Sequence, residues 1–242
     1  MRRVRESGVM HFKTGRLFLA ATMVSLMCAC TPQAALLASL VPQGTVDVLL
    51  GNLERVSYEN RERVGALTSR GAWKELTALA AVELEKDRSN ADWWLLAGYA
   101  HSQMLEHKVA AEAYAHVIRI EPDNPSGWHL LAQTHREAGE PHRAVNVLNN
   151  ALPALRDSAL TYYLLGESYS DLKRYGEAAA SYEGALKLEQ QFPSAWFSLG
   201  MAYQRLGRSA DARRAAVYLE KLDPKLAARL TAALSEGAAG DR

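Results

Sequence analysis

The chain has 242 residues, of which 48% are apolar and 23% charged, a composition that indicates a globular protein and excludes a disordered one. Its net charge of +1 is unevenly spread, because residues 1–29 hold five basic side chains against one glutamate and leave −3 for the rest. A mildly acidic body excludes the basic footprint of a nucleic-acid-binding protein. The two cysteines, Cys28 and Cys30, both precede the body, which therefore has no disulfide framework or thiolate metal site.

The first 29 residues have the pattern of a secretory signal peptide. A basic start is followed by eleven apolar residues, Leu17–Met27, and then by a small residue between the two cysteines. The apolar run is too short to cross a bilayer as a helix, which takes roughly 20 residues. We therefore predict an exported chain, and Met10 as the true start would give a more typical signal length than Met1.

The sequence Leu26-Met27-Cys28-Ala29-Cys30 resembles the lipobox of bacterial lipoproteins. The resemblance implies that Cys30 carries lipid, including palmitate, and that residues 30–45 tether it to the body. Thr31, where some lipoproteins have Asp, implies an outer-membrane protein that faces the periplasm. Met27 departs from the usual leucine, so an ordinary cleaved signal, which would give a soluble periplasmic protein, and an uncleaved anchor stay open.

The body repeats itself every 34 residues. A ring, then a small residue four positions on, then an alanine twelve further on recur four times without a gap. The rings are Trp94, Trp128, Tyr162 and Trp196, the small residues Gly98, Ala132, Gly166 and Gly200, and the alanines Ala110, Ala144, Ala178 and Ala212.

Each period predicts two amphipathic helices, because apolar residues recur at three- and four-residue steps in two runs separated by a turn. Gly139, Gly207 and the Lys173-Arg174 step fall in the turns, and Pro122 and Pro224 end second helices. We place full units at 91–124, 125–158, 159–192 and 193–224, and a degenerate unit with an N-terminal helix at 46–90. A helix over 225–236 is expected to cap the stack, followed by a flexible tail, 237–242.

This pattern resembles the tetratricopeptide repeat (TPR), whose units carry W-x₂-L-G-x₂-Y, then A-x₃-F/Y, A and P. The resemblance implies an all-α, right-handed α-solenoid of stacked antiparallel helix pairs whose first helices line a concave, protein-binding groove. The residues that it would place in the groove are Leu95, Tyr99, His129, Gln133, Arg136, Tyr163, Glu167, Phe197, Met201 and Gln204. This lining has few of the cations of a chaperone-type carboxylate clamp, which we therefore disfavour.

No catalytic motif is present: the sequence lacks G-x-S-x-G, a Walker-type loop, G-x-G-x-x-G and H-E-x-x-H. His101 and His135 hold equivalent positions in neighbouring units, where packed helices lie about 10 Å apart. A metal site would need a third ligand, and we favour histidine that replaces the tyrosine of the repeat in packing. We predict no enzyme activity, no cofactor, no metal and no small-molecule substrate.

Three functions compete. A signal of this kind joined to four or five repeats resembles the pilotin-like lipoproteins of type IV pili and of the tight-adherence pilus, whose partners are secretins and other machine subunits. The favoured hypothesis is therefore a membrane-anchored scaffold in the assembly of an envelope machine. The alternatives are a scaffold for outer-membrane protein insertion or polysaccharide export, and a soluble periplasmic adaptor that regulates an enzyme.

Overall fold

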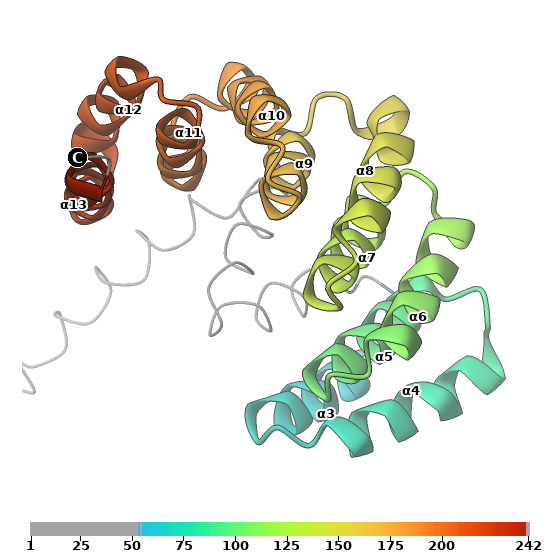
Figure 1. The fold of residues 1–242 in the computed structure, drawn as a ribbon. Helices are drawn as coiled ribbons and strands as arrows, with labels where there is room; N and C mark the ends of the chain where they lie inside the picture. The colour runs from blue at the N-terminus through green and yellow to red at the C-terminus, as the bar shows by residue number, and fades with distance from the viewer. Residues whose placement is uncertain (1–52, 54, 241–242) are drawn as a thin grey trace, which may run out of the picture.

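Helical hairpins follow one another along the chain in an arc (Figure 1). The computed structural model describes residue 53 and residues 55–240, with side chains described up to 235. The predicted signal peptide, the lipidation of Cys30 and the tether lie outside the described residues. Within them, the helices pair as follows: α3 (Tyr58–Ser69) with α4 (Trp73–Lys86), α5 (Ala91–Gln103) with α6 (His107–Ile120), α7 (Pro125–Glu137) with α8 (Pro141–Leu155), α9 (Ala159–Asp171) with α10 (Tyr175–Leu188), and α11 (Pro193–Arg205) with α12 (Ser209–Leu222).

The positions that precede the first helices of the four full units are 34 residues apart. Asn90, Asn124 and Ser158 precede α5, α7 and α9, and each side chain accepts a hydrogen bond from a backbone N–H of the first turn. Phe192 occupies the same place before α11 and makes no such bond. Its ring is buried instead, with its centroid 4.8 Å from that of Tyr163. At this position the fourth unit therefore has a buried ring that packs on the preceding unit, in place of a polar side chain that caps the helix.

The turns inside the hairpins repeat equally strictly. Gly71, Leu105, Gly139, Lys173 and Gly207, each 34 residues from the next, all have a positive φ, between 59° and 74°. Glycine adopts this left-handed conformation at no steric cost, whereas a residue with a Cβ is strained in it by roughly 1–2 kcal/mol. The turn geometry is therefore imposed by the hairpin, since Leu105 and Lys173 adopt it without being glycine.

Close approach inside each hairpin depends on a small residue that faces a large one. A Cβ added to Gly98 would lie 2.6 Å from Cε1 of Tyr114, and one added to Gly166 would lie 2.5 Å from Cε1 of Tyr182. Both rings are almost fully buried. Gly98 and Gly166 thus leave room for the rings that the second helices of their units contribute.

The fourth unit fills this space differently. Its second helix has Ala216 where Tyr182 stands one unit earlier, so no ring covers Gly200. Instead a Cβ on Gly200 would lie 2.6 Å from Cδ2 of Leu230, which belongs to α13 (Pro224–Gly240). Leu230 is completely buried. The C-terminal helix therefore completes the core of the last unit.

The capping helix expected over 225–236 is present but longer than predicted. Leu230 lies in a core cluster with Leu219 and Ala227, and Leu226 and Leu234 pack against this cluster, as the one-sided leucine pattern indicates. The helix continues to Gly240 and so includes the first four residues of the segment expected as a flexible tail. No proline interrupts this segment, and its two alanines favour helix whereas its two glycines do not.

The repeated tryptophans tie three of the four full units to the linker that precedes each of them. The indole N–H of Trp94 donates to the carbonyl of Arg88 at 2.9 Å, that of Trp128 to Pro122 at 2.8 Å, and that of Trp196 to Gln190 at 2.9 Å. In Figure 1 the second helices lie on the outer side of the arc and the first helices on its inner side. The α13 helix packs on both α11 and α12, at the end of the inner row.

Candidate functional site

Four of the residues predicted for the groove are packed between helices. Leu95, Tyr99, His129 and Tyr163 are all less than 9% exposed. The Tyr99 ring meets Trp73 edge-on at 5.7 Å, and the Tyr163 ring lies 5.8 Å from that of Tyr182. Tyr99 thus packs on the preceding unit and Tyr163 on the second helix of its own unit, which corrects the prediction that they line an exposed groove. The cause is that each first helix touches its own second helix and also helices of neighbouring units, so positions on these sides become core.

His129 is the most unusual of the four. It is 1% exposed, and its Nε2 lies 2.8 Å from Oγ1 of Thr161, which is completely buried on α9. Its Nδ1 has no hydrogen-bond partner among the described residues. Burial lowers the pKa of His129 to about 4, because the imidazolium would be stripped of water. The side chain is therefore a neutral packing group at neutral pH.

Arg136 and Glu167 are partly exposed but bonded to each other. The Arg136 guanidinium donates to Oδ2 of Asp171 at 2.7 Å and to Oε2 of Glu167 at 3.3 Å. The other oxygen of Glu167 accepts from the hydroxyl of Tyr182 at 2.7 Å and from that of Ser198 at 2.9 Å. Burial, with the Glu167 carboxylate second, raises the pKa of Tyr182.

This network joins four helices, α7, α9, α10 and α11, from three consecutive units. Asp171 and Ser198 were not predicted to belong to it. Its two partly exposed carboxylates and one guanidinium satisfy one another, so the network stiffens the inner face more than it offers a free charge. Arg136, the one basic residue predicted for the groove, is therefore bonded to carboxylates of its own chain, unlike the free cations of a chaperone-type carboxylate clamp.

The last three predicted groove residues, Phe197, Met201 and Gln204, meet the C-terminal helix. Phe197 and Met201 pack against the core cluster that contains Leu230, and the guanidinium carbon of Arg229 lies 5.5 Å from the centre of the Phe197 ring. The Gln204 amide donates to the carbonyl of Ala233 at 2.9 Å. The α13 helix thus occupies the inner face of the fourth unit.

The inner face of α7 and α9 is what remains accessible. Gln133, Arg136 and Glu167 are partly exposed there, and the Gln133 amide donates to Oε1 of Glu137 at 2.9 Å. Side-chain amides and carboxylates in an open row can bond the backbone of a bound peptide. The groove predicted over four units is therefore accessible mainly over the middle two.

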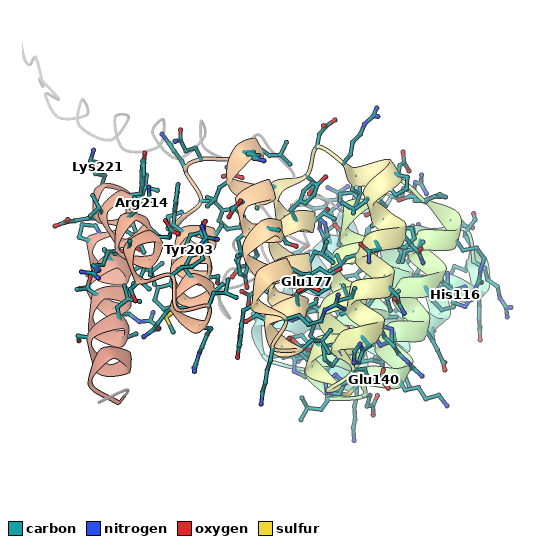
Figure 2. The ribbon with its side chains drawn as sticks, turned by 45° about the horizontal axis from the view of Figure 1, so that its top comes forward. His116, Glu140, Glu177, Tyr203, Arg214 and Lys221 are labelled. Atoms are coloured by element: carbon teal, nitrogen blue, oxygen red, sulfur yellow. The ribbon has the colours of Figure 1, made fainter. Side chains whose placement is uncertain are left out.

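The outer side carries a feature that the sequence did not reveal. A cleft of about 550 Å³ lies between α10 and α12, and residues of α11, including Trp196 and Tyr203, form its floor. The Trp196 ring stacks on that of Tyr218 with centroids 4.8 Å apart and planes 8° from parallel. Figure 2 labels Tyr203 and, on the α12 wall, Arg214.

Several polar and charged side chains of this cleft are bonded to one another. Asp211 accepts from Nε of Arg208 at 2.7 Å and also from Arg214. The Tyr203 hydroxyl donates to Oε1 of Glu183 at 2.7 Å, and the Arg208 guanidinium carbon lies 4.3 Å from the centre of its ring. Burial, with the bond to Glu183, raises the pKa of Tyr203 to about 12.

Comparison with known proteins agrees with this architecture. A family model described as anaphase-promoting complex, cyclosome, subunit 3, matches residues 103–185, and a TPR repeat model matches 167–207. Among solved structures, MamA aligns with a TM-score of 0.57 at 19% identity over 71% of this chain and 95% of that one. A thermophilic TPR protein of Thermus thermophilus aligns with a TM-score of 0.57 at 21% identity over 74% of this chain and 99% of that one.

The fold is a tetratricopeptide-repeat solenoid.

Curated relatives match about half of the chain. Anaphase-promoting complex subunit 3 of Schizosaccharomyces pombe is 27% identical over 45% of this chain, and Superkiller complex protein 3 of Mus musculus is 26% identical over 56%. A third match, the human protein O-mannosyl-transferase TMTC3, is 26% identical over 53%. The chain spans only 9–16% of the length of these three proteins. The repeats, which the TPR model matches directly, form a scaffold for protein interactions.

The predicted histidine pair has a structural role in its TPR units. Nδ1 of His101 lies 2.5 Å from Glu106, and Nδ1 of His135 lies 2.9 Å from Glu140, which Figure 2 labels. Each pair joins the end of a first helix to the residue that precedes the second. The next two TPR units use a tyrosine and an arginine at the same two positions, with the guanidinium carbon 4.8 Å and 4.3 Å from the ring centre.

The described residues include neither a metal-binding cluster nor a membrane-spanning helix. Across residues 53 and 55–240, no three His, Cys, Asp or Glu side chains gather closely enough to hold a metal ion. In the same part of the chain, no helix has the length and apolar character required to cross a bilayer.

Proposed function

We propose that this chain is a lipid-anchored TPR scaffold of the bacterial envelope that holds protein subunits during assembly of a machine such as a pilus or a secretin. The observation that carries the proposal is the unbroken stack of five helix pairs over the described residues, with an accessible, polar inner face on α7 and α9. A rigid row of helices of this kind binds a partner without ordering itself first, which lowers the entropic cost of association.

The lipid anchor is supported by sequence alone, through the basic start, the short apolar run and the small residue before Cys30. Acyl chains contribute roughly 0.8 kcal/mol per buried CH₂ group, so a multiply acylated Cys30 would hold the scaffold stably at a membrane. The names of two relatives, which denote members of multiprotein complexes, favour a role in assembly. Their membership of complexes bears on their own repeats and supports this proposal only by analogy.

The anchor is tested by metabolic labelling with a palmitate analogue in cells that express the wild-type chain or Cys30→Ala. Label and membrane association should both be lost from the variant, and Cys28→Ala should retain them. A labelled Cys30→Ala chain would remove the anchor from the proposal.

The partner surface is tested by placing a photo-cross-linking amino acid at Gln133, on the inner face, or at Asn149, an exposed position of α8 on the outer side. Irradiation of intact envelopes should yield discrete adducts from position 133 that contain subunits of an envelope machine, identified by mass spectrometry. Equal adduct patterns from positions 133 and 149 would reject the inner face as the binding surface.

A further inference from the structure

The outer face of α12 carries a row of two basic and two partly exposed apolar side chains. Arg214, Val217, Tyr218 and Lys221 are spaced at i, i+3, i+4 and i+7 and therefore share one side of the helix. Val217 is 60% exposed and Tyr218 is 50% exposed. Arg214 and Tyr218 line the cleft between α10 and α12, and Val217 and Lys221 lie beside them on the same side of the helix. Figure 2 labels Arg214 and Lys221 at this end of the molecule.

The same positions in the other units hold different residues, although a ring stack recurs once, since His116 stacks on Trp94 at 4.0 Å as Tyr218 does on Trp196. Tyr218 corresponds to His116, Asn150 and Gly184 in the three preceding units, and Arg214 corresponds to Glu112, Asn146 and Ala180. Hairpins of the same geometry form with each of these alternatives. An exposed apolar and basic combination that appears once in four equivalent places indicates an interaction surface.

The charges that a ligand would meet in the cleft are positive. Asp211 is tucked under two arginines and its side chain is 18% exposed, whereas that of Arg214 is 75% exposed. Glu183 is held by the Tyr203 hydroxyl. Lys187 on the α10 wall has no carboxylate partner among the described residues. Cations on both walls therefore face outward, while the carboxylates of the cleft are already bonded.

The rings of the cleft are ready to receive an apolar side chain. The indole N–H of Trp196 already donates to Gln190, and the Tyr203 hydroxyl already donates to Glu183. An apolar group that enters would thus leave neither donor without a partner, which removes the main cost of covering polar atoms. Exposed aromatic rings give large contact area at low conformational entropy cost.

The other cleft of similar size, between α3 and α4, lacks these properties. It is lined by no tyrosine or phenylalanine, and two of its cations are neutralised, Arg70 by Glu75 and Lys86 by Glu83. The combination of rings and outward-facing cations belongs to the α10–α12 cleft.

We propose that the cleft between α10 and α12 binds an acidic segment of a partner protein that inserts one aliphatic or aromatic side chain over Trp196 and Tyr218 and places carboxylates against Lys187, Arg214 and Lys221. This surface lies on the outer side of the solenoid, so it goes beyond the inner-face function proposed above and does not depend on Cys30. A scaffold with two separate surfaces holds two proteins at once.

The test measures fluorescence anisotropy of a labelled hexapeptide with a central Leu-Phe pair and two glutamates on each side, added to the full-length chain. A second peptide carries glutamine in place of each glutamate. Lys221→Glu is compared with Arg119→Glu, which makes the same charge change at the equivalent, exposed position of α6. Tyr218→Ala removes the ring, and thermal unfolding checks that each variant is folded.

We expect saturable binding of the glutamate peptide, at least tenfold weaker binding to Lys221→Glu and to Tyr218→Ala, and little change with Arg119→Glu. Equal binding of the glutamine peptide, or equal weakening by Arg119→Glu, would overturn the proposal, since binding would then be unspecific. Self-association of the chain that Lys221→Glu abolishes would also overturn it, because the occupant would be a second copy. Adducts from position 133 are expected to be unchanged by Lys221→Glu, which separates failure of this proposal from failure of the inner-face function.

Discussion

Acidification should destabilise the solenoid through a single buried histidine. His129 lies between α7 and α9, with Nε2 on Thr161 and with Nδ1 unpartnered among the described residues. Its pKa is lowered from 6.5 to about 4 in the folded chain by burial. Between these two values the unfolded chain binds a proton that the folded chain excludes, so stability falls as the pH falls from 7 towards 4.

The size of the effect follows from the two pKa values. Integrating proton binding from pH 7 to pH 5, with 6.5 for the unfolded and about 4 for the folded state, predicts a loss of about 2 kcal/mol. The total below pH 4 would approach about 3 kcal/mol. We choose pH 5 because carboxylates such as Glu177 and Asp211, whose pKa values are lowered by arginine partners, stay charged there.

The assay is urea unfolding followed by far-ultraviolet circular dichroism at pH 7 and pH 5, for the wild type and for His129→Gln. Glutamine does not titrate and keeps an amide within reach of Thr161, so its loss between the two pH values should be smaller than that of the wild type by about 2 kcal/mol. His142→Gln, at an exposed position of α8, controls for removal of a histidine. Parallel pH dependence in the wild type and His129→Gln would refute the reasoning.

Four further single substitutions and one double variant test the repeat geometry by the same urea assay. Lys173→Gly should raise the free energy of unfolding by about 1 kcal/mol, because Lys173 has a φ of 59°. Gly139→Ala should lower it by a similar amount from strain alone, since its Cβ would meet nothing within 4 Å, and an unchanged stability in both variants would contradict the turn argument. Gly166→Ala should lower the free energy of unfolding by about 1–3 kcal/mol, because the new Cβ overlaps Tyr182. Adding Tyr182→Leu should restore part of that free energy, and strictly additive effects of the two substitutions would show that the side chains do not meet. Leu230→Ala should cost about 3 kcal/mol and increase hydrogen exchange of α11, whereas exchange changes confined to α13 would show that this helix does not support the fourth unit.

Repetition allowed most of the architecture to be predicted. The 34-residue step placed five hairpins, the turns at Gly139 and Gly207 and a helix after Pro224, because spacing within one hairpin depends on local helix geometry. The step did not show the end of α13, since the helix continues through Gly237, where a glycine favours a helix end.

The candidate site was predicted less well, and for a physical reason. Residues in phase are equivalent, but residues in contact across neighbouring first helices are not 34 apart: Arg136 meets Glu167 at a separation of 31, and His129 meets Thr161 at a separation of 32. The offset arises from how far one packed helix slides along the next, which side-chain packing decides and no single unit encodes. For this reason the sequence alone did not separate buried from accessible groove positions.

The sequence by itself determined the period, the helix pairs, the turns and the empty spaces beside glycine. Only the tertiary structure decided that Leu230 fills the space left by Ala216, that α13 covers the inner face of the fourth unit, and that rings and cations meet in a cleft on its outer face. The first set depends on contacts within one hairpin, whereas the second depends on side chains from different hairpins whose relative position is fixed only when all units pack together.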